Sequence, residues 1–150
     1  MNNINIRLAN FEDIPHLLPL MAQLGYPTSS KEFTKRFKIF TKLPGYGVAV
    51  ACENSNIIGL VAWSKSSLFV SNTTRFHIEA IVLDQQYRGS GVGKKLMQFV
   101  EEMAKNSSPS IIDLTSGLRR AKDGSHEFYK KLGYQNEGYM AKLYLRKEIT

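Results

Sequence analysis

The spacing of apolar residues along this chain changes several times, and each spacing predicts a different kind of element. Residues 3–8 alternate apolar and polar side chains, which predicts a short strand. Residues 10–24 and 29–43 instead repeat apolar side chains every three or four positions, which predicts two amphipathic helices. Each of these helices is expected to begin at a cap, because an Asn or Ser is followed three positions later by an acidic residue.

From residue 47 onward the pattern favours strands and then alternates between strands and helices. The predicted strands are residues 47–53, 57–64, 75–83, 110–115 and 139–146, and the predicted helices are residues 92–103 and 124–132. The order βααβββαβαβ puts antiparallel strands first and a βαβ unit after them. It predicts a single domain over residues 1–150 with an α+β (three-layer α/β) fold, in which helices flank a central, mixed and mostly antiparallel sheet.

Composition is that of an ordinary globular protein, with 43% apolar and 22% charged residues in a chain of 150. A chain of this length buries roughly two-thirds of its unfolded surface, so it needs no metal or disulfide to hold a core. The single cysteine, Cys52, excludes a disulfide framework and is expected to be a buried, inert thiol. No signal-peptide pattern and no membrane-length apolar run is present, which favours a cytoplasmic protein without a membrane partner.

The chain is basic: 20 Lys and Arg residues against 13 Asp and Glu residues give a net charge of +7. Such a surface attracts anions, from nucleic acids to phosphorylated ligands. The basic residues are interpreted here as scattered pairs, such as Lys94-Lys95 and Lys130-Lys131, rather than the stripe or tail typical of nucleic-acid-binding proteins. The charge therefore predicts an anionic ligand, and no nucleic-acid partner is expected.

The segment 88–94, with the sequence RGSGVGK, lies between a predicted strand and a predicted helix. A helix N-terminus has free backbone N–H groups and the positive end of the helix dipole, and glycines let phosphate oxygens come close. The alternative is a turn whose glycines only relieve backbone strain. The strand before it and the helix after it favour a phosphate site.

Two familiar phosphate loops do not fit this segment. A Walker loop needs G-x-x-x-x-G-K-[ST], but Arg88 stands in place of the first glycine and Lys95 in place of the Ser or Thr. A dinucleotide-binding loop needs G-x-G-x-x-G, but Lys94 stands in place of the third glycine. Both nucleotide-binding interpretations are therefore excluded.

The spacing that does fit is Arg-x-x-Gly-x-Gly, made by Arg88, Gly91 and Gly93. It resembles the coenzyme A pyrophosphate loop of the GNAT superfamily of N-acetyltransferases. Further along, the segment 128–134, with the sequence FYKKLGY, resembles the FYxxxGF segment of the same family. The two N-terminal helices and the hairpin also match that architecture, so the resemblance covers nearly the whole chain.

This resemblance implies an enzyme that moves an acetyl group from acetyl-CoA to a primary amine of a small molecule or peptide, directly within a ternary complex and without a metal. Strand backbone would bind the pantetheine arm and loop amides the pyrophosphate, with Lys94, Lys95 or Lys122 as candidates for the outer phosphate. The coenzyme-binding residues that it implies are Ile81, Val82, Leu83, Arg88, Gly89, Ser90, Gly91, Val92, Gly93 and Lys94. The last strand could also serve as the edge of a homodimer.

Tyr129 matches the family tyrosine placed near the coenzyme sulfur, where a phenol can protonate the leaving thiolate. The alternative role is packing in the core beside Phe128. Many relatives carry N-x-x-A-x-x-F-Y at this point, but Lys122 replaces the Asn and Ser125 the Ala. The coenzyme contact of that Asn is therefore not expected here.

Glu79 interrupts an otherwise apolar strand, and burying an unpaired carboxylate is costly. Strand alternation predicts that it shares a face with His77, Ile81 and Leu83. Glu79, or else His77, could take a proton from an ammonium acceptor through water. The alternative is that Glu79 only sits at the solvated end of the strand.

The acceptor has no motif of its own. An aromatic stretch could line its pocket, although phenylalanines at this spacing are more often core residues. Its members are Tyr26, Phe33, Phe37, Phe40 and Tyr46. Glu79, Glu32 and Asp13 are candidates to attract a cationic amine. Two other functions stay open: a catalytically silent acyl-CoA-binding or sensing domain, and a basic nucleic-acid-binding domain whose binding would depend steeply on salt.

Overall fold

The computed structural model describes residues 3–116 and 124–150. The chain divides into two compact units, Met1–Ile112 and Asp113–Thr150. The elements in chain order are β1 (Ile4–Leu8), α1 (Ile14–Leu24), α2 (Ser30–Lys42), β2 (Gly47–Glu53), β3 (Asn56–Ser67), β4 (Thr74–Leu83), α3 (Val92–Lys105), β5 (Ser110–Leu114) and α4 (Ser125–Lys131), with short 3-10 helices η1 (Phe11–Asp13), η2 (Gln85–Tyr87) and η4 (Gly138–Met140). Within the described ranges, no helix is long and apolar enough to cross a membrane.

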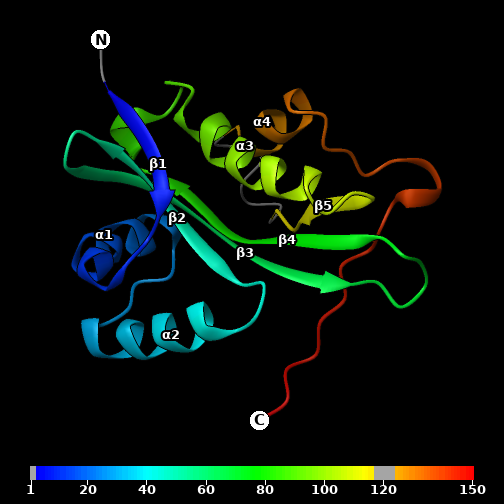
Figure 1. The fold of residues 1–150 in the computed structure, drawn as a ribbon, viewed down its shortest axis with the longest axis horizontal. Helices are drawn as coiled ribbons and strands as arrows, with labels where there is room; N and C mark the ends of the chain where they lie inside the picture. The colour runs from blue at the N-terminus through cyan, green and yellow to red at the C-terminus, as the bar shows by residue number, and fades with distance from the viewer. Residues whose placement is uncertain (1–2, 117–123) are drawn as a thin grey trace. The chain divides into compact units, whose positions relative to one another are not determined.

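The strands form one five-stranded sheet, in the order β1-β2-β3-β4-β5. The first four strands pair antiparallel with their neighbours, and the sheet as a whole is mixed. α1 and α2 cover one face and α3 covers the other (Figure 1). The expected α+β (three-layer α/β) fold is confirmed.

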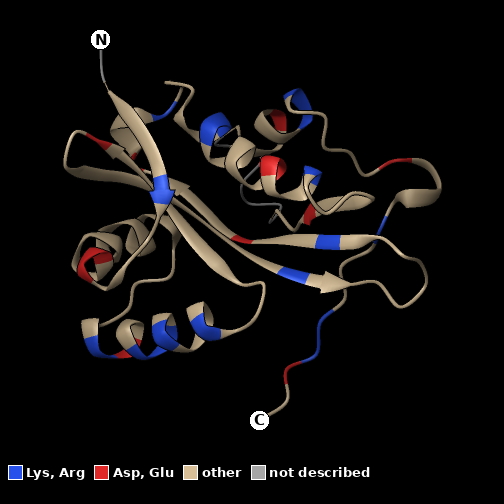
Figure 2. Ribbon diagram, in the orientation of Figure 1, with Lys and Arg blue, Asp and Glu red and all other residues tan. Residues whose placement is uncertain are grey.

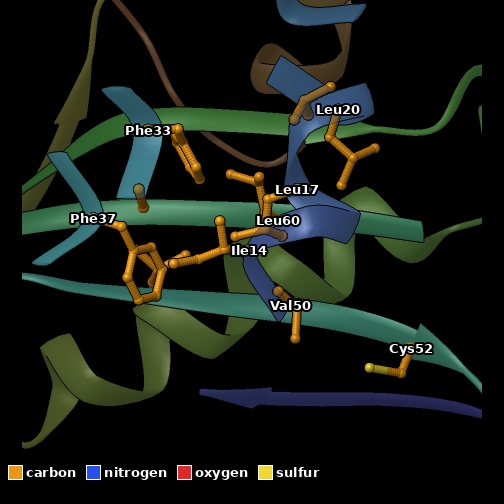
Figure 3. Packing of buried hydrophobic residues seen from close by; sticks show 11 residues of the cluster. Ile14, Leu17, Leu20, Phe33, Phe37, Val50, Cys52 and Leu60 are labelled. Atoms are coloured by element: carbon orange, nitrogen blue, oxygen red, sulfur yellow. The ribbon is translucent and has the colours of Figure 1, made fainter. Parts of the chain in front are cut away.

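The core under α1 and α2 is built from alternate positions of the strands (Figure 3). Apolar side chains of the two helices meet the residues of β2, β3 and β4 that point to that face, and the transfer of this surface from water is the main stabilising term. The buried members of this cluster are Ile14, Leu17, Leu20, Phe33, Phe37, Val48, Val50, Cys52, Leu60, Ala62 and Val82. Phe33, Phe37 and the Cys52 thiol therefore belong to the core.

The opposite face is shaped for close contact with α3. The alternate positions of β2 carry Ala49 and Ala51, whose small side chains are fully buried. At Gly59 of β3, an added Cβ would meet Leu96 of α3 at 3.2 Å. Small residues on the strands thus leave room for the large buried side chains of α3.

Two predicted helix starts are confirmed in detail. Ser29 caps α2, because its hydroxyl accepts the amide of Glu32 at 3.1 Å. Asp13 accepts the amide of Asn10 at 2.8 Å and also binds the Arg7 guanidinium with both oxygens, at 2.8 and 2.9 Å. Asp13 is buried and already paired, so the expectation that it attracts a cationic acceptor is wrong.

α2 concentrates positive charge, contrary to the interpretation of scattered basic pairs. Figure 2 shows Lys and Arg repeatedly along this helix. Four lysines recur at intervals of four, three and four residues, which places them along one face of the helix. They are Lys31, Lys35, Lys38 and Lys42, all exposed, and we call them the α2 lysine stripe.

The predicted strand over residues 139–146 is wrong. Residues 138–140 form a 3-10 helix, and residues 141–150 form neither helix nor strand. The alternating apolar side chains of Tyr139, Leu143 and Leu145 are exposed. A strand needs a neighbour for its backbone hydrogen bonds, and alternation in the sequence does not provide one.

Candidate acyl-coenzyme A and acceptor site

The glycine-rich segment forms a tight connection between β4 and α3. Gly89 has φ +79° and Gly91 has φ +88°, and both values lie in the left-handed region that favours glycine. An added Cβ at either position would meet no atom within 4 Å, so both glycines face open space. The loop therefore has its turn geometry fixed by glycine and an uncovered surface beside its backbone.

This surface has the features of an anion site. Gly91 caps α3, so the amides of Val92, Gly93 and Lys94 belong to the first turn, where no carbonyl of the same helix can accept them. α3 is 14 residues long and directs the positive end of its dipole to this point. The side chains of Arg88, Lys94 and Lys95 are exposed around it. These groups fit the diphosphate of a coenzyme A.

The residues predicted to bind the coenzyme differ in what they expose. The side chains of Val82 and Val92 are buried, so only their backbone could reach a ligand. The Ser90 hydroxyl donates to the carbonyl of Tyr87 and so closes the turn on itself. In β4, Ile81 pairs with Val61 of β3 through an antiparallel ladder. The binding of pantetheine by residues 81–83 stays a prediction.

Hydrogen bonds from two other elements hold the start of this loop. The Tyr87 hydroxyl donates to Oε1 of Glu53 at the end of β2, at 2.6 Å. This bond to Glu53 raises the pKa of Tyr87, so the phenol stays a donor at neutral pH. The Gln23 side-chain oxygen on α1 accepts the amide of Gln85 at 3.0 Å. The segment before the glycines, residues 85–87, is thereby attached to α1 and β2.

A β-bulge in β4 decides where Glu79 points. Ala62 of β3 pairs with Ala80, but the next residue, Trp63, pairs with Ile78, so Glu79 has no partner in the ladder. An extra residue of this kind shifts the alternation by one position and re-aims the side chain. The bulge therefore lies at the residue predicted to carry the chemistry.

The bulge corrects the predicted face of Glu79. Leu83 lies on the α3 face, because it approaches Gly59 beside Leu96. Ser64 lies on the α1 and α2 face, two positions after Ala62 of the core, and its hydroxyl binds Glu79. Glu79 thus shares this second face with His77, as predicted, but not with Ile81 and Leu83. Counting alternate residues failed because the bulge interrupts the count.

His77 is held in one hydrogen-bonding role. The Arg75 guanidinium lies 3.0 Å from Nδ1 of His77. A guanidinium can only donate, so Nδ1 is the acceptor in this contact. The neutral ring therefore has its proton on Nε2 and presents a donor there. In this arrangement His77 does not offer a free basic nitrogen at Nδ1, which favours Glu79 as the base.

Tyr129 lies on α4 in the second unit. Its ring is half-buried and packs at 5.1 Å from the ring of Phe128 and 6.3 Å from that of Tyr134, measured between centroids. The carbonyl of Tyr129 accepts the amide of Tyr134 at 3.0 Å. Aromatic packing and the turn after α4 thus define the ring position, and its role as an acid stays a prediction. Lys122 lies outside the described residues.

A pocket of about 540 Å³ lies elsewhere, at the C-terminal end of α3. Its walls include the aromatic rings of Tyr46, Trp63 and Phe76 and the side chain of Lys65. Trp63 and Phe76 point to the α3 face, opposite to Ser64 and His77. Thr41 and Val48 from the α2 side of the sheet also line the pocket, whereas Ser64, His77 and Glu79 do not.

Comparison with known proteins now decides the family. A model of the Acetyltransferase (GNAT) family matches residues 12–134, which include the glycine loop, Glu79 and Tyr129. The chain belongs to the GNAT family. Members of this family transfer an acetyl group from acetyl-CoA, which agrees with the anion site at the start of α3.

Individual GNAT relatives extend over nearly the whole chain. The uncharacterized N-acetyltransferase YhdJ of Bacillus subtilis is 24% identical over 135 residues, covering 89% of this chain and 93% of the relative. The solved structure of a GNAT family acetyltransferase from Staphylococcus aureus is 28% identical, with a TM-score of 0.80 and coverage of 99% and 100%. An aminoglycoside N-acetyltransferase, AAC(6')-Iy, solved in complex with CoA, has a TM-score of 0.82 at 17% identity, covering 99% of this chain and 97% of its own.

Sequence reasoning missed Ser64 and the bulge beside Glu79. A serine in a strand carries no signal of its own, and a bulge leaves no fixed residue pattern.

Proposed function

We propose that this GNAT protein is an N-acetyltransferase that transfers the acetyl group of acetyl-CoA directly to a primary amine of a small molecule or peptide. The observation that carries the proposal is the anion site formed by Gly89, Gly91 and the first turn of α3. Acetyl-CoA supplies a thioester whose carbonyl carbon accepts an amine. The residues of the chain bind it, prepare the amine and handle the protons.

Direct transfer is favoured over an acyl-enzyme. The chain has one cysteine, and its thiol lies in the core under α1 and α2 with 5% of the residue exposed. A buried thiol cannot attack a thioester bound at the surface. The burial of the thiol thus supports a ternary complex, in which the amine and acetyl-CoA are bound together.

Each proton in the reaction has a proposed carrier. The acceptor arrives as an ammonium, and a Glu79 carboxylate oxygen takes one proton, directly or through water, to leave a neutral amine. The amine nitrogen then forms the new bond to the acetyl carbon while the carbon–sulfur bond breaks. The Tyr129 hydroxyl gives a proton to the leaving sulfur, and the second proton released by the nitrogen restores the phenol through solvent. The products are an amide, a free thiol and one proton.

Calorimetric titration with acetyl-CoA tests the coenzyme site first. The wild type is expected to bind at micromolar concentration, and Gly91→Glu is expected to abolish binding because it adds a side chain and a negative charge to the anion site. Gly138→Glu is the matched control: Gly138 also has a positive φ and open space beside it, so backbone strain and charge change alike.

The two variants distinguish an effect at the glycine loop from a general effect of added charge or backbone strain. Equal loss of binding in Gly138→Glu would show that charge or strain, not the loop, is responsible, and wild type without binding would reject the proposal. Release of free thiol from acetyl-CoA in the presence of amines then distinguishes an enzyme from a silent acyl-CoA-binding domain, which would bind and not turn over.

A further inference from the structure

A buried serine lies beside the proposed base. Ser64 pairs with His77 across the β3–β4 ladder, and 8% of the residue is exposed. Its hydroxyl donates to Oε2 of Glu79 at 2.7 Å. This distance is typical of a strong hydrogen bond from a hydroxyl to a charged carboxylate.

The bond determines which oxygen of Glu79 is presented. A glutamate has three rotatable side-chain bonds, and an exposed one samples several rotamers. Glu79 is exposed and lies at the bulge, where no ladder partner restrains it. Because Ser64 is fixed in a buried strand, its bond to Oε2 restricts the carboxylate, and Oε1 is the oxygen that Ser64 does not bind.

We propose that Ser64 is a positioning residue that holds the Glu79 carboxylate so that Oε1 faces the acceptor amine. The inference rests on the proposed function. The bulge brings Glu79 to the face of Ser64, and the serine hydroxyl then fixes its direction. Ser64 itself touches neither the coenzyme nor the reacting atoms.

Turnover of three variants tests this role. The wild type, Ser64→Ala and Glu79→Gln are assayed by thiol release from acetyl-CoA with glucosamine 6-phosphate, kanamycin, spermidine and a peptide with a free N-terminus. Glu79→Gln is expected to lower kcat about 100-fold, as loss of a general base does. Ser64→Ala is expected to lower kcat about tenfold, the effect of one hydrogen bond, with KM for acetyl-CoA unchanged.

Controls within the same strand exclude a general structural effect. Ser66→Ala makes the same change two positions further on the same face, at an exposed serine, and is expected to leave kcat unchanged. Ser64→Thr keeps a hydroxyl and is expected to restore most of kcat. In the Glu79→Gln background, Ser64→Ala is expected to have no further effect, because the group that Ser64 positions is gone.

The outcomes separate this inference from the proposed function. If Glu79→Gln is impaired and Ser64→Ala is not, or if the two effects multiply in the double variant, Ser64 does not act through Glu79 and only the inference fails. If Glu79→Gln keeps full activity, the base assignment fails and the inference with it. If the wild type neither binds acetyl-CoA nor releases thiol with any of the four amines, the proposed function itself is wrong.

Discussion

At the scale of single residues, the pair Arg7 and Asp13 joins β1 to the start of α1. The hydrogen bonds from Arg7 lower the pKa of Asp13 below its usual range, and burial opposes that effect only in part. The Asp13 carboxylate accepts hydrogen bonds from the Arg7 guanidinium and from the Asn10 backbone amide, so it links β1 to the start of the helix. The ionised carboxylate of Asp13 therefore stabilises the folded state.

We expect Asp13→Asn to destabilise the protein by about 2 kcal/mol at neutral pH, the typical contribution of hydrogen bonds to a charged group. Because the pKa of Asp13 is lower folded than unfolded, its contribution is complete above the unfolded value of about 4 and is lost as pH falls through the folded value. The difference between variant and wild type should therefore shrink in acid.

Urea unfolding between pH 7 and pH 2 measures the difference in unfolding free energy between Asp13→Asn and the wild type. Glu12→Gln is the control, because it removes one negative charge at the preceding, exposed position. A pH-independent difference for Asp13→Asn would contradict the role given to its charge.

Tyr87 holds the segment that leads into the proposed coenzyme site. Its hydroxyl holds the segment before Arg88 to Glu53, whose Oε2 is buried with no partner among the described residues. Tyr87→Phe removes this bond, so the loop loses a restraint and must be ordered by the ligand.

We expect Tyr87→Phe to raise the Kd for acetyl-CoA by about three- to tenfold, in proportion to one hydrogen bond. Calorimetric titration measures it beside Tyr26→Phe, which removes a hydroxyl from an exposed tyrosine far from the loop in sequence. Equal affinities for Tyr87→Phe and wild type would show that the loop holds its shape without β2.

At the scale of elements, α2 is held by its core contacts despite repulsion along its surface. Phe33 and Phe37 are buried on the side of α2 that faces the core. The α2 lysine stripe places positive charges about one helical turn apart on the exposed side. Like charges at this spacing destabilise a helix by a few tenths of a kcal/mol for each pair. The burial of two aromatic rings outweighs that cost several-fold.

Lys35→Glu should therefore stabilise the protein by about 0.5 kcal/mol at low ionic strength, since the new carboxylate would be flanked by Lys31 and Lys38. The gain should disappear in about 1 M salt, where exposed charges are screened within a few ångströms. Urea unfolding at both salt concentrations measures the effect, with Lys35→Gln, which only removes repulsion, as the intermediate case. A gain that persists in high salt would point to packing.

The elements also show what the sequence could predict. Helix caps, the phenylalanine spacing of α2 and the glycines before α3 are local signals, and each led to the element found. The bulge at Glu79 and its bond to Ser64 depend on how β3 and β4 align, which no local pattern records. Local chemistry was therefore predictable, and the relation between strands was not.

At the scale of the whole molecule, the family and the order of layers followed from two motifs and the periodicity. The glycine loop and the FYKKLGY segment predicted a GNAT protein from the sequence alone, and the family match confirms it. The strand over residues 139–146 failed because alternation reports which side chains could share a face, while pairing requires a neighbouring backbone.

The acceptor stays the least predictable part. A binding site for an amine is assembled from side chains of several elements, each ordinary in its own segment. Ser64, His77 and Glu79 came together only once β3 and β4 were aligned. The amine acceptor is therefore to be identified by the turnover assay, whereas the proposed coenzyme site was predicted from one continuous segment.

The unpaired residue of β4 also affects how related sequences must be read. The even-numbered residues of β4 change from one face of the sheet to the other at residue 79. Before it, Phe76 and Ile78 lie on the α3 face, and after it, Ala80 and Val82 lie on the α1 and α2 face. An alignment that moves a one-residue gap across this point would pair inner with outer residues over half the strand. Deletion of residue 79 would remove the bulge and make the alternation of β4 continuous. In one half of the strand, the side chains that now face α3 would then face α1 and α2, and the reverse.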